Sequence, residues 1–339
     1  MKIINQTHFD FMRWRWHAVA LSWAVILLGL VVVLTKGIPR GLEFAGGTAV
    51  IMQFDQTPSD DAVRTALSRN FPGGGQNAVV QTYGDASLRQ KMVRVPQVGE
   101  ESGASLGATA AAVEQALRQA DLGNFSVVGT EIVGPAVGRE LTSRGVSAMV
   151  LSLAGILLYI AFRYQFSFAV GAVVATVHDL LITLAFLAFF QYDLTLNVIA
   201  ALLTVTGYST NDTIVIFDRV RENLRGMRRD GMREVINVSI NQTLGRTILT
   251  AGTTLMSALA LFLFGGEVLR GFAFTMIVGV ITGTYSSVFV AAAVVTFWKG
   301  RGPTRAAAHA PAPAAGAARE RAPQQPTRRQ KPARKAHAS

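Results

Sequence analysis

The most informative part of the sequence is the stretch LNVIAALLTVTGYSTNDTIVIFDRVREN, residues Leu196–Asn223. It is apolar enough to enter a bilayer, yet it carries a block of polar and ionisable residues at Tyr208–Thr213. A carboxylate in the middle of a span costs about 2.5–3.5 kcal/mol on insertion scales. Asp212 is therefore expected to be paired, hydrated or functional, and a place in an ion pathway is the first interpretation. The alternative is a hydrogen-bond acceptor between packed helices.

The composition is typical of a membrane protein. The chain has 339 residues, of which 50% are hydrophobic and only 16% are charged, against about 25% charged residues in an average soluble domain. Its mean hydropathy is +0.34. A spanning helix needs about 20 apolar residues, and the following windows approach or exceed that length: 18–35, 146–162, 166–190, 196–217, 247–264 and 272–298. The absence of Cys excludes disulfides and thiolate metal sites.

Basic residues beside these windows predict the orientation, because short loops rich in Lys and Arg face the cytoplasm. They occur before the first window (Lys2, Arg13, Arg15), between the second and third (Arg163), between the fourth and fifth (Arg219, Arg221, Arg225, Arg228, Arg229, Arg233) and after the sixth (Lys299, Arg301, Arg305). All four regions can be cytoplasmic only if both termini are inside. The long segment between the first two windows is then external.

The sequence thus predicts a polytopic α-helical membrane protein with six transmembrane helices and one external domain. Its parts are a cytoplasmic arm (1–17), spans at 18–36, 144–163, 166–190, 195–218, 246–264 and 271–298, an external domain (37–143), a cytoplasmic loop (219–245) and a basic cytoplasmic tail (299–339). Residues 301–339 hold +8 of the formal net charge of +11. This tail cannot bury a core, so we expect disorder. It is either simply solvated or in contact with anionic lipid or ribosomal RNA.

The external segment is predicted to fold as an α+β domain. Ser59 followed by two aspartates is a typical helix start, and stretches of alternating polarity indicate strands. The expected strands are 48–54, 78–83, 91–96 and 124–133, and the expected helices are 59–71 and 105–120. The order βαββαβ is that of a ferredoxin-like unit. Because the segment lacks His and Cys, and its glycine run Gly73–Gly75 follows Pro72 rather than a strand, we expect a docking domain without cofactor or metal.

Polar residues at helical spacing in three other spans suggest a hydrated seam around Asp212. The fifth span carries Arg246, Thr250, Thr253 or Thr254, and Ser257; the sixth carries Thr275, Gly279, Thr282 or Gly283, and Ser286. Small residues at that period allow close helix approach. The third span contributes His178 and Asp179, whose role stays open between packing and function. The candidate seam residues are Ser209, Asn211, Thr213, Thr250, Thr254 and Ser257.

Asp212 and Arg246 are the natural charge pair of this seam. The guanidinium stays protonated and would hold Asp212 ionised until a proton or another cation competes. We find no arrangement of nucleophile and base, no nucleotide loop and no metal-ligand cluster in the sequence. We therefore expect a protein that is not an enzyme.

Several strings together resemble the SecD/SecF family of the resistance-nodulation-division (RND) superfamily, and specifically its SecF branch. The resemblance covers about residues 10–299. It rests on GLEFAGGT (41–48), VGPAVGREL (133–141), STNDTIVIFDRVREN (209–223), NVSINQTLGRT (237–247) and FGGEVLRGFAF…GTYSSVF (264–289). The motif positions are Gly41, Glu43, Gly46, Gly47, Gly134, Pro135, Gly138, Asp218 and Arg219. Glu43 and Gly245 depart from the Asp and Ser that are usual in the family.

The resemblance implies a six-span half of an RND-type bundle in the bacterial inner membrane. It implies an accessory subunit of the Sec preprotein translocase that works with SecD and the proton-motive force in late steps of export through SecYEG. Asp212 and Arg246 become the proton-relay candidates. The implied partners are SecD, SecYEG, exported unfolded polypeptide and membrane lipids, with YajC and YidC as further candidates and no specific nucleic acid.

Two other classes stay open on the sequence. An RND-type exporter of lipids or small molecules usually holds two six-span cassettes and larger external loops, whereas this chain has one cassette. A membrane scaffold without transport activity would need no charge inside a span, so Asp212 and Arg246 argue against it.

Overall fold

The structure is a computed structural model that describes residues 7–71, 78–84, 86–96, 103–120, 122–164 and 166–299. The start of the predicted arm, the turn expected at Pro72–Gly75 and the basic tail after residue 299 lie outside these ranges.

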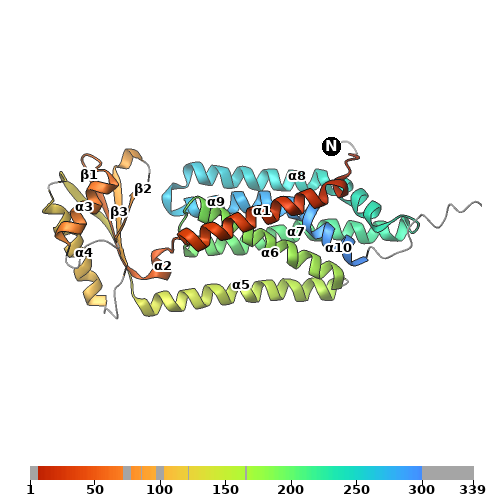
Figure 1. The fold of residues 1–339 in the computed structure, drawn as a ribbon, viewed down its shortest axis with the longest axis horizontal. Helices are drawn as coiled ribbons and strands as arrows, with labels where there is room; N and C mark the ends of the chain where they lie inside the picture. The colour runs from red at the N-terminus through yellow and green to blue at the C-terminus, as the bar shows by residue number, and fades with distance from the viewer. Residues whose placement is uncertain are drawn as a thin grey trace, which may run out of the picture. The chain divides into compact units, whose positions relative to one another are not determined.

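The segment between α1 (Phe11–Lys36) and α5 (Pro135–Arg163) forms the predicted α+β domain (Figure 1). Strands β1 (Gly47–Phe54), β2 (Val79–Tyr83), β3 (Gln90–Pro96) and β4 (Phe125–Val133) make an antiparallel sheet in the order β2-β3-β1-β4. Helices α3 (Asp60–Asn70) and α4 (Gly103–Arg118) pack on one face of it, and a short 3₁₀ turn, η2, spans Ala86–Leu88. This order of strands and helices confirms the ferredoxin-like βαββαβ unit. Ser59 caps α3 as predicted, because its Oγ accepts the Ala62 N–H at 3.2 Å.

Alternation along the strands explains why the helices cover that face. Val50, Met52 and Phe54 of β1 point to α3 and α4 and are almost fully buried with Leu67 and Leu117. Side chains at odd positions of the same strand point to the opposite face, because successive residues of a strand alternate between faces. There, Ala49 and Ile51 pack with Leu42 of α2 (Leu42–Ala45), a short helix inside the glycine motif that the sequence did not predict.

Long helices make up most of the remaining chain. They are α1 (Phe11–Lys36), α5 (Pro135–Arg163), α6 (Phe166–Phe189), α7 (Leu196–Gly226), α8 (Met232–Phe264) and α9 (Gly266–Ser286), which runs through a π-helical turn η3 (Ser287–Ala291) into α10 (Ala292–Lys299). Within the described residues, five helices are long and apolar enough to cross a membrane: α1, α5, α6, α8 and the continuous run from α9 into α10. The predicted fourth span is α7, an unbroken helix of 31 residues whose polar block lowers its hydropathy. Its crossing of the membrane stays a prediction.

The helices extend past the predicted membrane spans. The segment 219–245, predicted as a cytoplasmic loop, is mostly helical, with only a short connection between the end of α7 at Gly226 and the start of α8 at Met232. Likewise α1 begins at Phe11, where the Asp10 side chain accepts the Arg13 N–H at 3.0 Å. Most charged residues of the segment 219–245 therefore lie on the polar ends of α7 and α8, whereas Arg228, Arg229 and Asp230 lie in the short connection between them.

Helices α6 and α9 form the buried centre, whereas α1, α5 and α8 expose most of their apolar surface. Close approach between α9 and α7 depends on two small residues of the predicted stripe. A Cβ atom added at Gly279 would overlap the Val205 side chain, and one at Gly283 would lie 2.9 Å from the Ser209 Cβ. This contact confirms that the small residues of the sixth span allow close packing.

Candidate coupling site in the helix bundle

Asp212 lies on the face of α7 that turns into the bundle. Its side chain is 2% exposed, and Oδ2 has no hydrogen-bond partner in the described structure. Helix α7 packs against α6, α8 and α9, so the carboxylate is enclosed by protein rather than by lipid. A buried acceptor without a partner is costly, so Asp212 is a candidate for a functional role.

Arg246 of α8 is exposed, and no ion pair joins it to Asp212 among the described residues. The guanidinium nevertheless acts on the carboxylate through a Coulombic interaction. The two residues are thus neighbours across α7 and α8 without the direct pair that the sequence suggested. Tyr208, one turn before Asp212, faces Thr250 and Thr254 of α8.

The other predicted seam residues divide into buried and exposed groups. Ser209 and Thr213 are buried, and the Thr213 hydroxyl lies 2.9 Å from that of Ser287 in η3. Thr250 and Thr254 are half-buried and donate to carbonyls of their own helix. Asn211 and Ser257 are exposed. The buried part of the seam therefore runs from α7 towards α6 and α9 more than towards α8.

A second buried carboxylate, Asp179 of α6, is the best-connected polar group of the seam. Its Oδ2 accepts from the hydroxyls of Ser209 (2.5 Å) and Ser286 (2.8 Å), and its Oδ1 lies 2.9 Å from Nδ1 of His178. Three helices thus meet at one side chain that is 1% exposed. The sequence left Asp179 undecided. The polar positions at Ser209 and Ser286 were visible, but their meeting at Asp179 depends on how the helices pack.

The glycine motif positions connect the ferredoxin-like domain to the helices. Gly41 N–H donates to the Leu194 carbonyl at 2.7 Å, and a Cβ there would lie 2.8 Å from the same oxygen. Gly46 (φ 69°) ends α2, and Gly47 (φ 121°) begins β1. Left-handed φ values favour glycine. Pro135 starts α5 directly after its cap, Gly134.

The remaining motif positions are Gly138 on α5 and Asp218 and Arg219 on α7. A Cβ at Gly138 of α5 would lie 3.4 Å from the carbonyl oxygens of Glu43 and Phe44, so α2 packs closely on α5. At the end of α7, Arg219 donates to Gln242 at 2.7 Å and to Glu222 at 2.5 Å, whereas Asp218 is exposed.

A buried ion pair also joins the sheet to the turn before α7. Arg94 of β3 donates to Asp193 at 2.7 Å and to the carbonyl of Arg40 at 2.9 Å. Leu194 N–H donates to the Pro39 carbonyl at 2.7 Å. The segment that starts the Asp212-bearing helix is therefore bonded to the ferredoxin-like domain.

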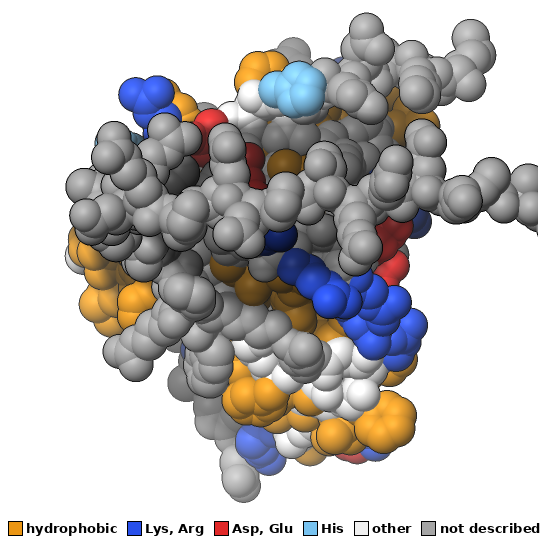
Figure 2. Space-filling view, turned by 90° about the vertical axis from the view of Figure 1, so that its right-hand side faces the viewer, with side chains coloured by type: hydrophobic (Ala, Val, Ile, Leu, Met, Phe, Trp, Pro, Cys, Tyr) orange, Lys and Arg blue, Asp and Glu red, His pale blue; other side chains and the backbone are white. Residues whose placement is uncertain are grey.

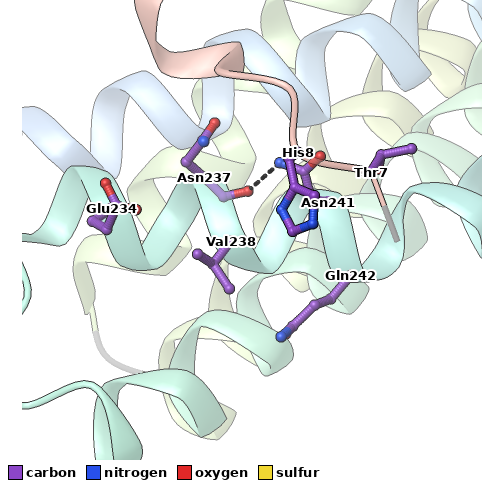
Figure 3. A pocket seen from close by; sticks show the side chains of 7 residues that line it. All are labelled: Thr7, His8, Glu234, Asn237, Val238, Asn241 and Gln242. Carbon is purple, nitrogen blue, oxygen red and sulfur yellow. Dashed lines mark hydrogen bonds between the residues drawn. The ribbon is translucent and has the colours of Figure 1, made fainter. Parts of the chain in front are cut away.

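The pocket in Figure 3 lies near the start of α8, between this helix and the N-terminal residues Thr7 and His8. It has a volume of about 290 Å³, and its lining residues are Thr7, His8, Glu234, Asn237, Val238, Asn241 and Gln242. The side chains of Asn237 and Asn241 accept the backbone N–H groups of Phe11 (2.9 Å) and Phe9 (3.0 Å). The arm is thus bound to α8, and this pocket is separate from Asp212.

Basic side chains gather on the face seen in Figure 2, next to apolar ones. The connection between α7 and α8 lies at this end of the bundle in Figure 1. Arg228 and Arg229 lie in this connection, and the adjoining turns of α7 and α8 carry Arg219, Arg221, Arg225 and Arg233; all six are exposed or half-buried.

Long apolar helices around buried carboxylates, with one ferredoxin-like domain attached, define a polytopic α-helical membrane protein. Two family models match: "Protein export membrane protein SecD/SecF, C-terminal" over residues 112–301, and "SecD/SecF GG Motif" over residues 31–58. The chain belongs to the SecD/SecF family of protein export membrane proteins.

Curated relatives place the chain beside the SecF members of that family. It is 46% identical over 282 residues to the protein translocase subunit SecF of Pseudomonas aeruginosa, covering 83% of this chain and 87% of the relative. It is 42% identical over 297 residues to that of Desulfurispirillum indicum, covering 87% and 93%. Both relatives are matched over nearly their whole length.

A solved structure agrees with the fold. The crystal structure of SecDF from Thermus, titled a translocon-associated membrane protein, matches with a TM-score of 0.75 and 37% identity. The match covers 87% of this chain but 39% of that longer one.

Proposed function

We propose that the chain is an accessory subunit of the bacterial Sec preprotein translocase, located in the inner membrane with both termini in the cytoplasm. In this proposal it assembles with SecD and uses the proton-motive force to promote late steps of export through SecYEG. The names of its relatives support the role in translocation. The length of the SecDF structure beyond the matched part supports a SecD partner.

The observation that carries the proposal is the buried Asp212 carboxylate with an unpartnered oxygen. Protonation would remove the charge from this buried carboxylate and so lower the cost of burying it. Release of the proton would restore a negative charge, which Arg246 offsets through a Coulombic interaction but without a direct ion pair. Movement of one charge across 100 mV is worth about 2.3 kcal/mol, which is enough to bias a helix rearrangement between two states.

Two alternatives are less well supported. A small-molecule or lipid exporter would share the RND-type bundle, but the relatives are named as translocase subunits. A scaffold without transport would have no need for an unpartnered carboxylate in α7. We expect no enzymatic activity, cofactor or metal, and among the described residues no cluster of His, Asp and Glu could hold a metal ion.

Substitution of Asp212 by Asn tests the proposal. The amide keeps the shape of the side chain but cannot take up or release a proton. We expect Asp212→Asn to assemble with SecD normally and to lose the part of preprotein export that depends on the proton-motive force, measured in inverted membrane vesicles. Arg246→Lys keeps the charge but loses the planar guanidinium, so a partial defect is expected.

The matched control is Asp218→Asn on the same helix, because Asp218 is exposed and an exposed charge contributes about 0–1 kcal/mol. Export by Asp212→Asn with a normal response to the proton-motive force would refute a coupling role for Asp212. Purification of the chain without SecD would refute the proposed complex.

A further inference from the structure

We propose that His178 and Asp179 form a second proton-exchange site in the seam, distinct from Asp212, with His178 as the group that gains and loses the proton. This inference rests on the proposed function, because it adds a site to the same coupling pathway. It is carried by the geometry of α6 and by the hydroxyls that reach Asp179 from α7 and α9.

The hydrogen bonds of Asp179 leave its charge without a basic partner other than His178. Its two hydroxyl partners, Ser209 and Ser286, are neutral. In the part of the chain that the structure describes, the recorded ion pairs include no Lys or Arg with Asp179. A buried carboxylate in such a place is expensive, and an adjacent imidazolium would compensate it. The His178 ring is the only ionisable group recorded in contact with this carboxylate in the described residues.

The contact between the two residues determines which nitrogen of His178 is free. In this proposal Asp179 is ionised and therefore only accepts hydrogen bonds, so Nδ1 of His178, which lies 2.9 Å from Oδ1 of Asp179, carries a hydrogen and donates it to that oxygen. In the neutral ring, Nε2 then holds the basic lone pair. The structure leaves this Nε2 buried and without a hydrogen-bond partner, on a side chain that is 8% exposed. This is the second, independent sign of a site that exchanges a proton.

The proton balance at this pair is simple. When Nε2 takes up a proton, the ring becomes an imidazolium that faces the Asp179 carboxylate through Nδ1–H. When Nε2 releases the proton, the ring is neutral and Nδ1–H still donates to the carboxylate. Asp179 thus orients His178 and stabilises its charged form without itself being protonated.

The surroundings connect this pair to two other helices. The ring of Tyr285 on α9 stacks on His178 with centroids 6.4 Å apart, and its hydroxyl donates to the Ala18 carbonyl of α1 at 2.6 Å. Ser22 of α1 donates to the same hydroxyl at 3.3 Å. On α7, Ser209 lies one helical turn before Asp212, so the two carboxylates are linked to the same stretch of helix.

Histidine nuclear magnetic resonance on the full-length protein tests the chemistry directly. The chain has five His, and the signal of His178 is assigned by its loss in His178→Gln. We expect a neutral ring with its proton on Nδ1 at high pH, and uptake of a proton at Nε2 when the pH is lowered. In Asp179→Asn the amide cannot compensate an imidazolium, and the ring should stay neutral when the pH is lowered in the same way.

A force-dependent export assay in vesicles that contain SecD tests the role. Asp179→Asn can still accept from Ser209 and Ser286, so it preserves the junction of the three helices while removing its charge. We expect Asp179→Asn and His178→Gln to assemble normally and to lose the export that depends on the proton-motive force. The matched control is Thr183→Val on α6, because the buried Thr183 hydroxyl donates only to a carbonyl of its own helix.

Two results would overturn the inference. One is a His178 ring that stays neutral throughout the titration or carries its proton on Nε2. The other is normal force-dependent export by Asp179→Asn while Asp212→Asn is defective, which would leave the proposed function intact. If both variants export normally, the proposed function fails as well.

Discussion

At the scale of single residues, the molecule treats its buried charges in three ways. Asp179 is surrounded by donors from three helices, Asp212 has an oxygen without a partner, and Arg94 forms an ion pair with Asp193. Removal from water is expensive for each of them. Of these three residues, only Arg94 has an oppositely charged partner at hydrogen-bond distance. We therefore expect the loss of Arg94 to act mainly on stability.

Arg94→Ala should therefore destabilise the contact between β3 and the turn before α7. The Arg94 and Asp193 side chains are 9% and 22% exposed. Because Asp193 keeps some contact with water, we expect about 2–3 kcal/mol, below the roughly 3–5 kcal/mol for breaking a fully buried pair. Thermal unfolding of the purified protein measures the effect. Arg118→Ala, which removes an exposed pair with Glu114, should change stability by under about 1 kcal/mol, and equal effects would contradict this view.

At the scale of elements, the packing of α9 against α7 depends on glycines as much as on large apolar side chains. Val205 and Ser209 of α7 occupy the space that side chains at Gly279 and Gly283 would need. The polar seam is narrow here because these two helices approach closely. Hydroxyls of α9 and η3 thereby reach Asp179 and Thr213.

Gly279→Ala tests this packing against a glycine in open space. An added methyl group at Gly279 would overlap Val205, and overpacking typically costs about 1–3 kcal/mol. The same change at Gly252 of α8, where nothing lies within 4 Å, should be neutral or stabilise by about 0.5–1 kcal/mol, because alanine favours the helix. A comparison of the two melting temperatures is the measurement. Equal stability of the two variants would show that α7 and α9 can separate without cost.

At the scale of the whole molecule, hydrogen bonds connect the ferredoxin-like domain to the Asp212-bearing helix. The turn at Asp193 and Leu194 is bonded to Arg94 of the sheet and to Pro39 before the glycine motif. A change in α7 can thus reach the sheet through its own first turn. In the predicted topology, the sheet and the arginine-rich end of the bundle lie on opposite sides of the membrane.

Cysteine labelling tests that orientation, since the natural chain has no Cys. We expect Gln56→Cys, exposed after β1, to react with an impermeant maleimide added to the outer side of the inner membrane. Arg229→Cys, exposed between α7 and α8, should react only after the membrane is opened. The reverse pattern would overturn the predicted topology. Labelling of both cysteines from the outer side would place positions 56 and 229 on the same side of the membrane and contradict α7 as a membrane-spanning helix between them.

The sequence alone determined the elements whose causes are local. Alternation and a capping serine predicted the βαββαβ domain, and long apolar windows predicted the helices. The energetic cost of a carboxylate in Leu196–Asn223 identified Asp212 as a candidate functional residue. These signals depend on residues that are close in the chain, because strand alternation, helix caps and hydropathy all act over a few residues.

Only the tertiary structure decided which polar groups meet. Ser209, Ser286 and Asp179 are far apart in the chain, and their hydrogen bonds depend on the rotation and separation of α6, α7 and α9. The same packing left Arg246 exposed and without an ion pair to Asp212 among the described residues. A helical stripe indicates which residues share a face of one helix. Which side chains of a neighbouring helix lie opposite that face depends on close packing between the helices, and no local sequence pattern predicts it.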